Sequence, residues 1–299
     1  NNNTISVLGN PNPGAFAAQS NTTLSGSGKL TMTQEPYSFI QTAAGVTLTQ
    51  AAGHTIDGTG NITAALVNNG LISSTTATIN LNTKDKVNNG LIRSQPGHNL
   101  RISGITISQG SSGQIFADGS IVILDPAVIS GGTLASANGG YFGGAVTLNK
   151  VTNNGAIAVG DMGITGGSLV NNGSIVFRGN PNLGVLEVIG DTVVTGTGTI
   201  ASTQGGYSLM KIDPGFTLTN GAGAVCAWVA AGAGAPAGGI HSSHSAAAPA
   251  MASSSAMASR PGDGRQARPA APVSVRAGAG LERDCLSKAC FRRQGAGGL

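Results

Sequence analysis

The sequence predicts an all-β chain, in which a right-handed parallel β-helix (β-solenoid) covers residues 1–223 and a disordered C-terminal tail covers residues 224–299. Three observations lead to this prediction. Short segments alternate apolar and polar residues, the turn motif Asn-Asn-Gly recurs along the chain, and large side chains are scarce. Units of about 20 residues cannot bury an apolar face alone, so successive units must stack. The right hand follows from the bias of parallel crossover connections.

The composition restricts what can fill the interior. Of 299 residues 48 are Gly, while aromatic residues make up 4% and charged residues 9%. One Trp, three Tyr and seven Phe are too few for a core of large side chains, so small and β-branched residues must fill it. Hydrophobic residues reach 40%, which argues against a chain that is disordered throughout.

The strand prediction rests on a period of two. Residues 30–33, 46–49, 79–82 and 105–108 alternate Ile, Leu, Val or Met with Thr, Ser or Asn, which is typical of strands with one buried face. With a spacing of about 4.8 Å between stacked strands, residues 1–223 would make roughly eleven coils and a rod on the order of 50 Å long. The predicted interior includes Ile62, Leu66, Ile72, Ile92, Ile157 and Ile175.

Internal repeats support the stacking. Val-Asn-Asn-Gly-Leu-Ile occurs at residues 67–72 and 87–92, and close relatives occur at 152–157 and 170–175. Residues 9–53 also align without a gap on residues 179–223, with 18 of 45 positions identical. Because the opening residues match an interior repeat, we expect the chain to be a segment of a longer protein.

The turns shared by the repeats are the candidate structural site. Their members are Asn68, Asn69, Gly70, Asn88, Asn89, Gly90, Asn153, Asn154, Gly155, Asn171, Asn172 and Gly173. If the turns are equivalent, the asparagines can form ladders of side-chain amides along the rod. Alternatively, each Asn only adopts a left-handed turn, and the glycines supply positive φ.

The repeat pattern ends at Gly223. Residues 224–299 lack Thr and Asn, contain all three Cys and are rich in Ala, which predicts either a frameshifted product or a disordered Ala/Pro/Ser-rich linker. Neither end of the repeat region shows a capping unit. We therefore expect the isolated chain to associate through its exposed strand edges.

Motifs for metals, cofactors and nucleic acids are incomplete, so we expect no metal site and no cofactor. The pairs His241/His244 and Cys285/Cys290 lie in low-complexity sequence that lacks a fold to hold zinc. The segment 26–31 fails the phosphate-loop pattern, and 57–61 is interpreted as a turn without an ion. No aromatic residues interleave with the arginines of the tail, which argues against nucleic-acid binding. The sequence contains no run of 18 apolar residues, so it predicts no transmembrane segment in this chain.

An enzyme would need clustered carboxylates, as polysaccharide lyases and hydrolases do. The acidic residues of the repeat region are scattered singly, although stacking could bring Asp118 and Asp161 together. The sequence therefore favours a noncatalytic role and leaves a polysaccharide-degrading enzyme as an alternative.

The Asn-Asn-Gly turns, the Gly-Thr-Gly-x-Ile steps and the Thr/Asn-rich alternation over residues 1–223 resemble the β-helical passenger regions of bacterial surface adhesins. These are autotransporter passengers and filamentous-haemagglutinin-like exoproteins. The resemblance implies a secreted or cell-surface, outer membrane-associated adhesin segment that binds a host glycan or protein, or neighbouring bacterial cells. It also implies a barrel or transporter partner outside this chain. A structural stalk that presents a distal binding domain is the other alternative.

Overall fold

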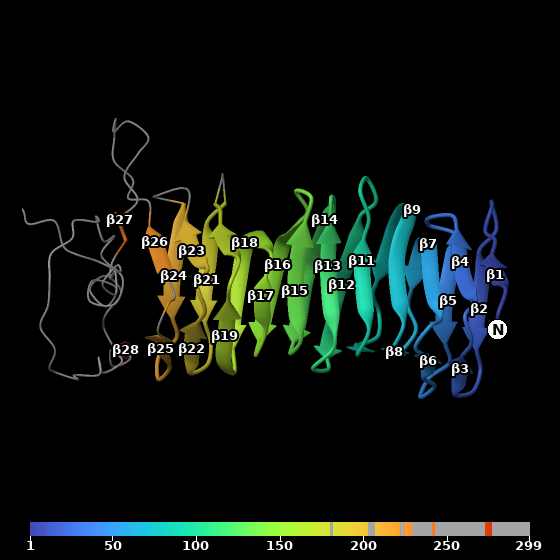
Figure 1. Ribbon diagram of the computed structural model, residues 1–299, viewed down its shortest axis with the longest axis horizontal. Coiled ribbons are helices and arrows are strands. Elements are labelled where there is room, and N and C mark those ends of the chain that lie inside the picture. The colour runs from blue at the N-terminus through green and yellow to red at the C-terminus, as the bar shows by residue number, and fades with distance from the viewer. Residues whose placement is uncertain are drawn as a thin grey trace, which may run out of the picture.

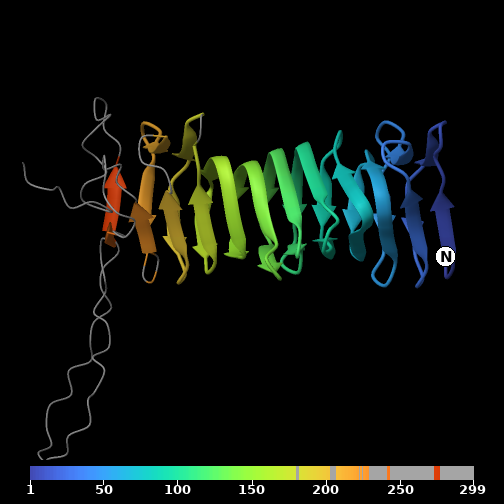
Figure 2. The same cartoon turned by 90° about the horizontal axis from the view of Figure 1, so that it is seen from above.

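A computed structural model describes residues 1–179, 182–202, 207–221, 223, 225–228, 241–242 and 273–276. Over these ranges the chain is all-β without a helix, and its strands stack as a parallel β-solenoid, which confirms the predicted fold class. Figure 1 shows the strands side by side along a rod that begins at the N-terminus, and Figure 2 shows the same succession from above.

Each coil has three faces, here called A, B and C, and a strand on one face pairs in parallel with the strand on the same face of the next coil. Face A contains β1 (Thr4–Val7), β4 (Lys29–Thr33), β11 (Leu91–Ser94), β13 (Gln114–Asp118), β15 (Thr133–Ala137), β17 (Thr152–Asn154), β19 (Gly167–Asn171), β22 (Thr192–Thr195) and β25 (Thr217–Asn220). Face B contains β2 (Gly14–Ala18), β5 (Ser38–Thr42), β20 (Ser174–Phe177), β23 (Thr199–Ser202) and β26 (Val225–Trp228). Face C contains β3 (Thr22–Leu24), β6 (Leu48–Gln50), β8 (Leu66–Asn68), β10 (Lys86–Asn88), β21 (Gly184–Val188) and β24 (Ser208–Ile212).

Six longer strands bend around a corner and contribute to two faces. β7 (Thr55–Ile62) and β9 (Leu71–Leu81) run from face A to face B. β12 (Leu100–Gln109), β14 (Ile121–Ser130), β16 (Tyr141–Asn149) and β18 (Ala156–Thr165) run from face B to face C. With these strands included, face C has ten stacked strands, so the described chain makes ten complete coils, close to the eleven predicted.

Parallel pairing continues beyond Gly223, where the sequence pattern ends. β26 pairs in register with β23, from Thr199 opposite Val225 to Ser202 opposite Trp228. A free strand edge offers backbone donors and acceptors to any extended segment, so this pairing does not need the Thr/Asn pattern. Two short strands, β27 (His241–Ser242) and β28 (Val273–Arg276), pair antiparallel with β26 and β25.

The interior is a set of columns in which each apolar side chain stacks on its counterpart in the next coil. On face A, one column is formed by Ile56, Ile72, Ile92, Ile115 and Leu134, which are register partners in successive coils and are all buried. All six interior residues predicted from the sequence are also buried, at 0–2% exposure. Branched aliphatic side chains suit this arrangement because they pack against neighbours on the pleated surface of a sheet.

Glycines with positive φ let a strand turn a corner without a loop. Gly58 (φ +102°) lies where β7 passes from face A to face B, and Gly144 (φ +110°) lies where β16 passes from face B to face C. A Cβ on Gly144 would lie 1.9 Å from the Leu124 carbonyl oxygen of the preceding coil. The segment 57–61, expected to be a turn, is therefore part of a bent strand.

The long internal repeat is out of phase with the coil. Its first copy begins with β2 on face B, whereas the aligned β21 of the second copy lies on face C. Likewise β4 lies on face A and the aligned β23 on face B. The second copy is thus displaced around the rod by one face.

Truncating one column residue tests this interior. Ile72→Ala should lower the free energy of unfolding by about 2–5 kcal/mol, since neighbouring coils held in register cannot collapse into the space. Leu71→Ala, on the adjacent half-buried and outward-facing residue, should cost about 1 kcal/mol or less. Urea unfolding followed by circular dichroism measures both; equal losses would contradict the assigned register.

Candidate functional site

The Asn-Asn-Gly turns contain buried ladders of side-chain amides. Between faces C and A, Asn68 Nδ2 donates to Asn88 Oδ1 at 2.8 Å, and Asn88 Nδ2 donates to Gln109 Oε1 at 3.0 Å. Gln109 Nε2 then donates to the Gly131 carbonyl oxygen. Asn68 and Asn88 are almost fully buried, so these amides act between coils and are closed to an external ligand.

A second, outer ladder lies beside the first and has the opposite polarity. Asn89 Nδ2 donates to Asn69 Oδ1 at 2.9 Å, and Asn69 Nδ2 donates to the Gln50 carbonyl oxygen. The inner amides therefore donate toward the C-terminal coils and the outer amides toward the N-terminal coils. Antiparallel amide dipoles side by side attract one another electrostatically.

The other two turns form the same pair of ladders at a different corner. Asn153 Nδ2 donates to Asn171 Oδ1 at 2.8 Å and Asn172 Nδ2 to Asn154 Oδ1 at 3.0 Å, between faces A and B. The sequence predicted four equivalent turns. They are not equivalent, because the repeat moves to the next face along the rod. The ladders are real, but they are two separate pairs.

The left-handed alternative for these turns is wrong. None of the eight asparagines has a positive φ, and the φ of Gly70, Gly90, Gly155 and Gly173 also lies outside the left-handed region. A Cβ on Gly90 would instead lie 2.2 Å from the Gly70 carbonyl oxygen, and one on Gly173 2.0 Å from that of Gly155. Glycine is needed here because consecutive coils approach closely.

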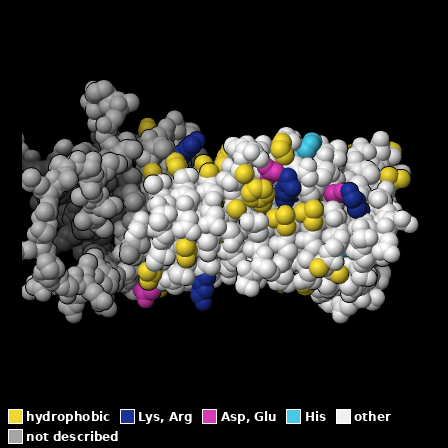
Figure 3. All heavy atoms as spheres, in the orientation of Figure 1, with side chains coloured by type: hydrophobic (Ala, Val, Ile, Leu, Met, Phe, Trp, Pro, Cys, Tyr) yellow, Lys and Arg dark blue, Asp and Glu magenta, His cyan; other side chains and the backbone are white. Residues whose placement is uncertain are grey.

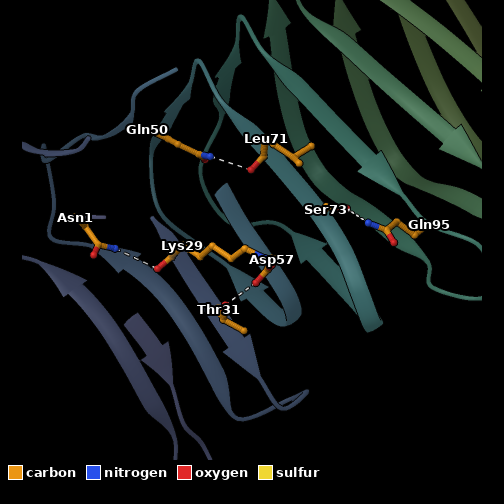
Figure 4. A network of polar contacts seen from close by, with 8 residues as sticks. All are labelled: Asn1, Lys29, Thr31, Gln50, Asp57, Leu71, Ser73 and Gln95. Carbon is orange, nitrogen blue, oxygen red and sulfur yellow. Dashed lines mark hydrogen bonds and ion pairs between the residues drawn. The ribbon is translucent and has the colours of Figure 1, made fainter. Parts of the chain in front are cut away.

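Face A carries a cluster of polar side chains in its first coils (Figure 4). Asp57 accepts hydrogen bonds from Lys29 Nζ at 3.2 Å and from Thr31 Oγ1 at 2.6 Å. On the next coils Gln95 Nε2 donates to Ser73 Oγ at 2.8 Å. These bonds join side chains from different coils, and their acceptors Asp57 and Ser73 are buried.

Farther along face A, Arg93 forms an ion pair with Asp118. Asn138 Nδ2 also donates to Asp118 Oδ1 at 2.7 Å. The hydrogen bond from Asn138 and the pairing with Arg93 hold the pKa of Asp118 below its ordinary value. Acid–base pairs of this kind are sparse on the side of the rod seen in Figure 3, which is otherwise largely uncharged.

Asp118 and Asp161, the two carboxylates considered for an enzyme, lie on different faces. Asp118 is paired in register with Ala137 on face A, whereas Asp161 is paired with Val185 on face C. Across the described ranges, no three His, Cys, Asp or Glu residues form a group suited to a metal ion. Stacking therefore does not bring Asp118 and Asp161 together.

The structure also reveals a buried lysine that the sequence analysis did not single out. Lys86 occupies a column position on face C between Leu66 and Ile107, and is 3% exposed. Its Nζ donates to the carbonyl oxygens of Ala64, Asn82 and Lys84 at 3.1, 3.0 and 2.6 Å. Burial lowers the pKa of Lys86 to about 7. The signal that could have revealed this lysine in the sequence is a single charged residue at a position that is apolar in the neighbouring coils.

A shallow groove of about 580 Å³ lies on face C over the later coils. Its lining includes Thr147, Asp161, Gly163, Val185, Glu187 and Leu209. The groove arises from side-chain sizes in neighbouring coils, so it could be found only once the register was known.

Three of the zinc-ligand candidates in the tail, His244, Cys285 and Cys290, lie outside the described residues. Of the fourth candidate, His241, only the backbone is described. Most of the segment 224–299, predicted to be disordered or frameshifted, also lies outside the described residues. In the part of the chain that is described, no helix has the length and apolar character needed to span a membrane.

Comparison with known proteins identifies no relative: no family model, no curated protein and no solved structure matches the chain.

The inner ladder should be expensive to interrupt. Asn88→Ala leaves an Asn68 N–H, Gln109 Oε1 and the Gln114 carbonyl oxygen without these partners, and should cost about 3 kcal/mol or more in the free energy of unfolding. Asn172→Ala, in an exposed outer ladder, should cost about 1 kcal/mol or less. Chemical unfolding of both variants checks the order, and a larger loss for Asn172→Ala would contradict it.

Lys86 should make the free energy of unfolding depend on pH in the alkaline range. The pKa of Lys86 is about 7 in the folded chain against an ordinary value of 10.5, so between these limits the unfolded chain binds more protons. The free energy of unfolding should therefore rise with pH by about 1.4 kcal/mol per unit through this window, and the contribution should be constant below it. Lys86→Met should remove that rise. Identical pH profiles for the two proteins would show that Lys86 does not titrate in this way.

Proposed function

We propose that the chain is a noncatalytic segment of a secreted or cell-surface bacterial adhesin. It would bind a host glycan or protein, or a neighbouring bacterial cell, through the Thr/Asn/Ser-containing surface of face A. The observation that carries the proposal is a single in-register row of outward side chains on that face. Its members are Thr31, Asp57, Ser73, Arg93, Phe116, Ala135 and Asn154. Asp57 and Ser73 are buried, and the other five are half-buried or exposed.

The five accessible members support adhesion because they offer donors, acceptors and one aromatic ring along coils that are spaced by about 4.8 Å. Bonds between coils, such as Thr31 to Asp57, already hold several of these groups in place. A surface ordered before binding loses less conformational entropy when a ligand docks. A repetitive row also allows many weak contacts to act together.

The environment of the carboxylates also favours a noncatalytic role. Asp57, Asp118 and Asp125 are paired with basic side chains of neighbouring coils, as is Glu187 with Lys211. Others, such as Asp85, accept a hydrogen bond from a backbone amide of the next coil. Carboxylates used to join coils are poorly suited to exchange protons with a substrate. A polysaccharide-degrading enzyme and a stalk stay the alternative proposals.

Binding of the full chain to epithelial cells and to a glycan array tests the proposal. Wild type should bind, and Arg93→Ala should weaken binding about tenfold by removing a charged hydrogen-bonding group from face A. Arg101→Ala, which breaks the ion pair with Asp125 between β12 and β14 on face B, is the matched control and should bind as wild type does.

Absence of binding to cells and glycans would favour the stalk, and cleavage of polysaccharides on the array would favour the enzyme. Thermal unfolding of both variants ensures that a loss of binding is not a loss of fold.

A further inference from the structure

The groove on face C crosses several stacked coils and therefore runs along the rod. Gly163, an outward-facing residue within β18, is part of its lining. The φ of Gly163 lies outside the left-handed region, so the backbone does not require glycine. A Cβ there would lie 3.0 Å from Thr147 Oγ1 and 3.5 Å from Ile189 Cδ1, so a side chain at this position would press against Thr147 and fill the space beside it.

Glycine weakens a strand, and within a strand it often marks the close approach of a ligand or another chain. Ala145 in the preceding coil is also small, which extends the hollow along the rod. The backbone conformation of Gly163 thus does not require this hollow.

The charged side chains of the groove differ in whether they have an oppositely charged partner. Lys211 Nζ is paired with Glu187 at 2.7 Å and with Asp213 at 2.8 Å, and its hydrogen bonds to these carboxylates raise the pKa of Lys211. Asp161 has no basic partner in the described ranges, and only its Oδ1 is engaged, by the Val185 amide at 3.2 Å. An exposed carboxylate oxygen, Asp161 Oδ2, therefore stands at the groove without a neutralising cation.

The walls beside this carboxylate are apolar. Val185 and Leu209 are register partners on adjacent coils, Leu209 is 39% exposed, and Ile189 completes the lining on the other side of Gly163. A carboxylate oxygen next to aliphatic surface matches an ammonium group on an aliphatic stem, which buries its methylenes while its charge is paired.

We propose that this groove binds lysine side chains of a partner polypeptide. Lysine fits better than arginine because a guanidinium prefers to engage both oxygens of a carboxylate, and Asp161 Oδ1 is already bonded to Val185. An ammonium is a compact charge that needs only the remaining oxygen. The site is separate from face A, and it would serve an adhesin or a stalk equally.

Fluorescence anisotropy of the full chain with labelled peptides tests the proposal. The probe is a short peptide of alternating alanine and lysine, compared with otherwise identical peptides that carry arginine or serine in place of lysine. The lysine peptide should bind saturably, the arginine peptide about threefold more weakly and the serine peptide not measurably. Asp161→Asn should weaken binding of the lysine peptide about fivefold, the range of one exposed ion pair.

Asp191→Asn is the matched control, because Asp191 Oδ1 likewise accepts a backbone amide of the next coil, from Thr217 at 2.8 Å, outside the groove. It should leave binding unchanged. Gly163→Val fills the hollow and should weaken binding at least as much as Asp161→Asn, and Gly163→Ala replaces it if the larger side chain prevents folding.

Four results would overturn the proposal: no binding of the lysine peptide, equal or tighter binding of the arginine peptide, equal binding by Asp161→Asn and wild type, or equal losses in Asp161→Asn and Asp191→Asn. Loss of cell binding by face A variants does not bear on these outcomes, so the two proposals fail separately.

Discussion

In-register parallel pairing between successive coils is the constraint on which the rest of the structure depends. It places each residue over its counterpart one coil earlier, as Ile72 lies between Ile56 and Ile92. The same constraint aligns Asn68 with Asn88, so that their buried amides satisfy one another. A polar residue inside the rod is therefore tolerated where the next coil supplies its partner, and Lys86 instead uses three backbone carbonyls.

The three faces are interchangeable as folding units. The strand that opens the long repeat lies on face B in its first copy and on face C in its second, yet it pairs in parallel in both places. The Asn-Asn-Gly turn likewise forms its double ladder at two different corners. A strand and its turn need only a parallel neighbour and a close approach at the glycine, so a repeat can drift around the rod without breaking the stack.

The sequence predicted the fold and the interior because both depend on local alternation, as the burial of Ile72 and Ile157 shows. The existence of amide ladders was also predictable from repeated asparagines. Which asparagines meet was not, since it depends on how many residues each corner uses, and Asn88 proved to join Asn68 and Gln109 instead of Asn153 or Asn171. The groove at Gly163 and the partners of Lys86 arise from coils distant in sequence, and no local pattern encodes them.

Distances between spin labels along one row of face A test the central claim most directly. With Cys226, Cys285 and Cys290 replaced by serine, cysteine pairs join Thr31 to Arg93, Ala135 or Asn154, which the register places three, five and six coils away. At about 4.8 Å per coil, pulsed electron paramagnetic resonance should give distances near 14, 24 and 29 Å that increase linearly with coil number. Distances that do not increase in this order would contradict the continuous in-register stack.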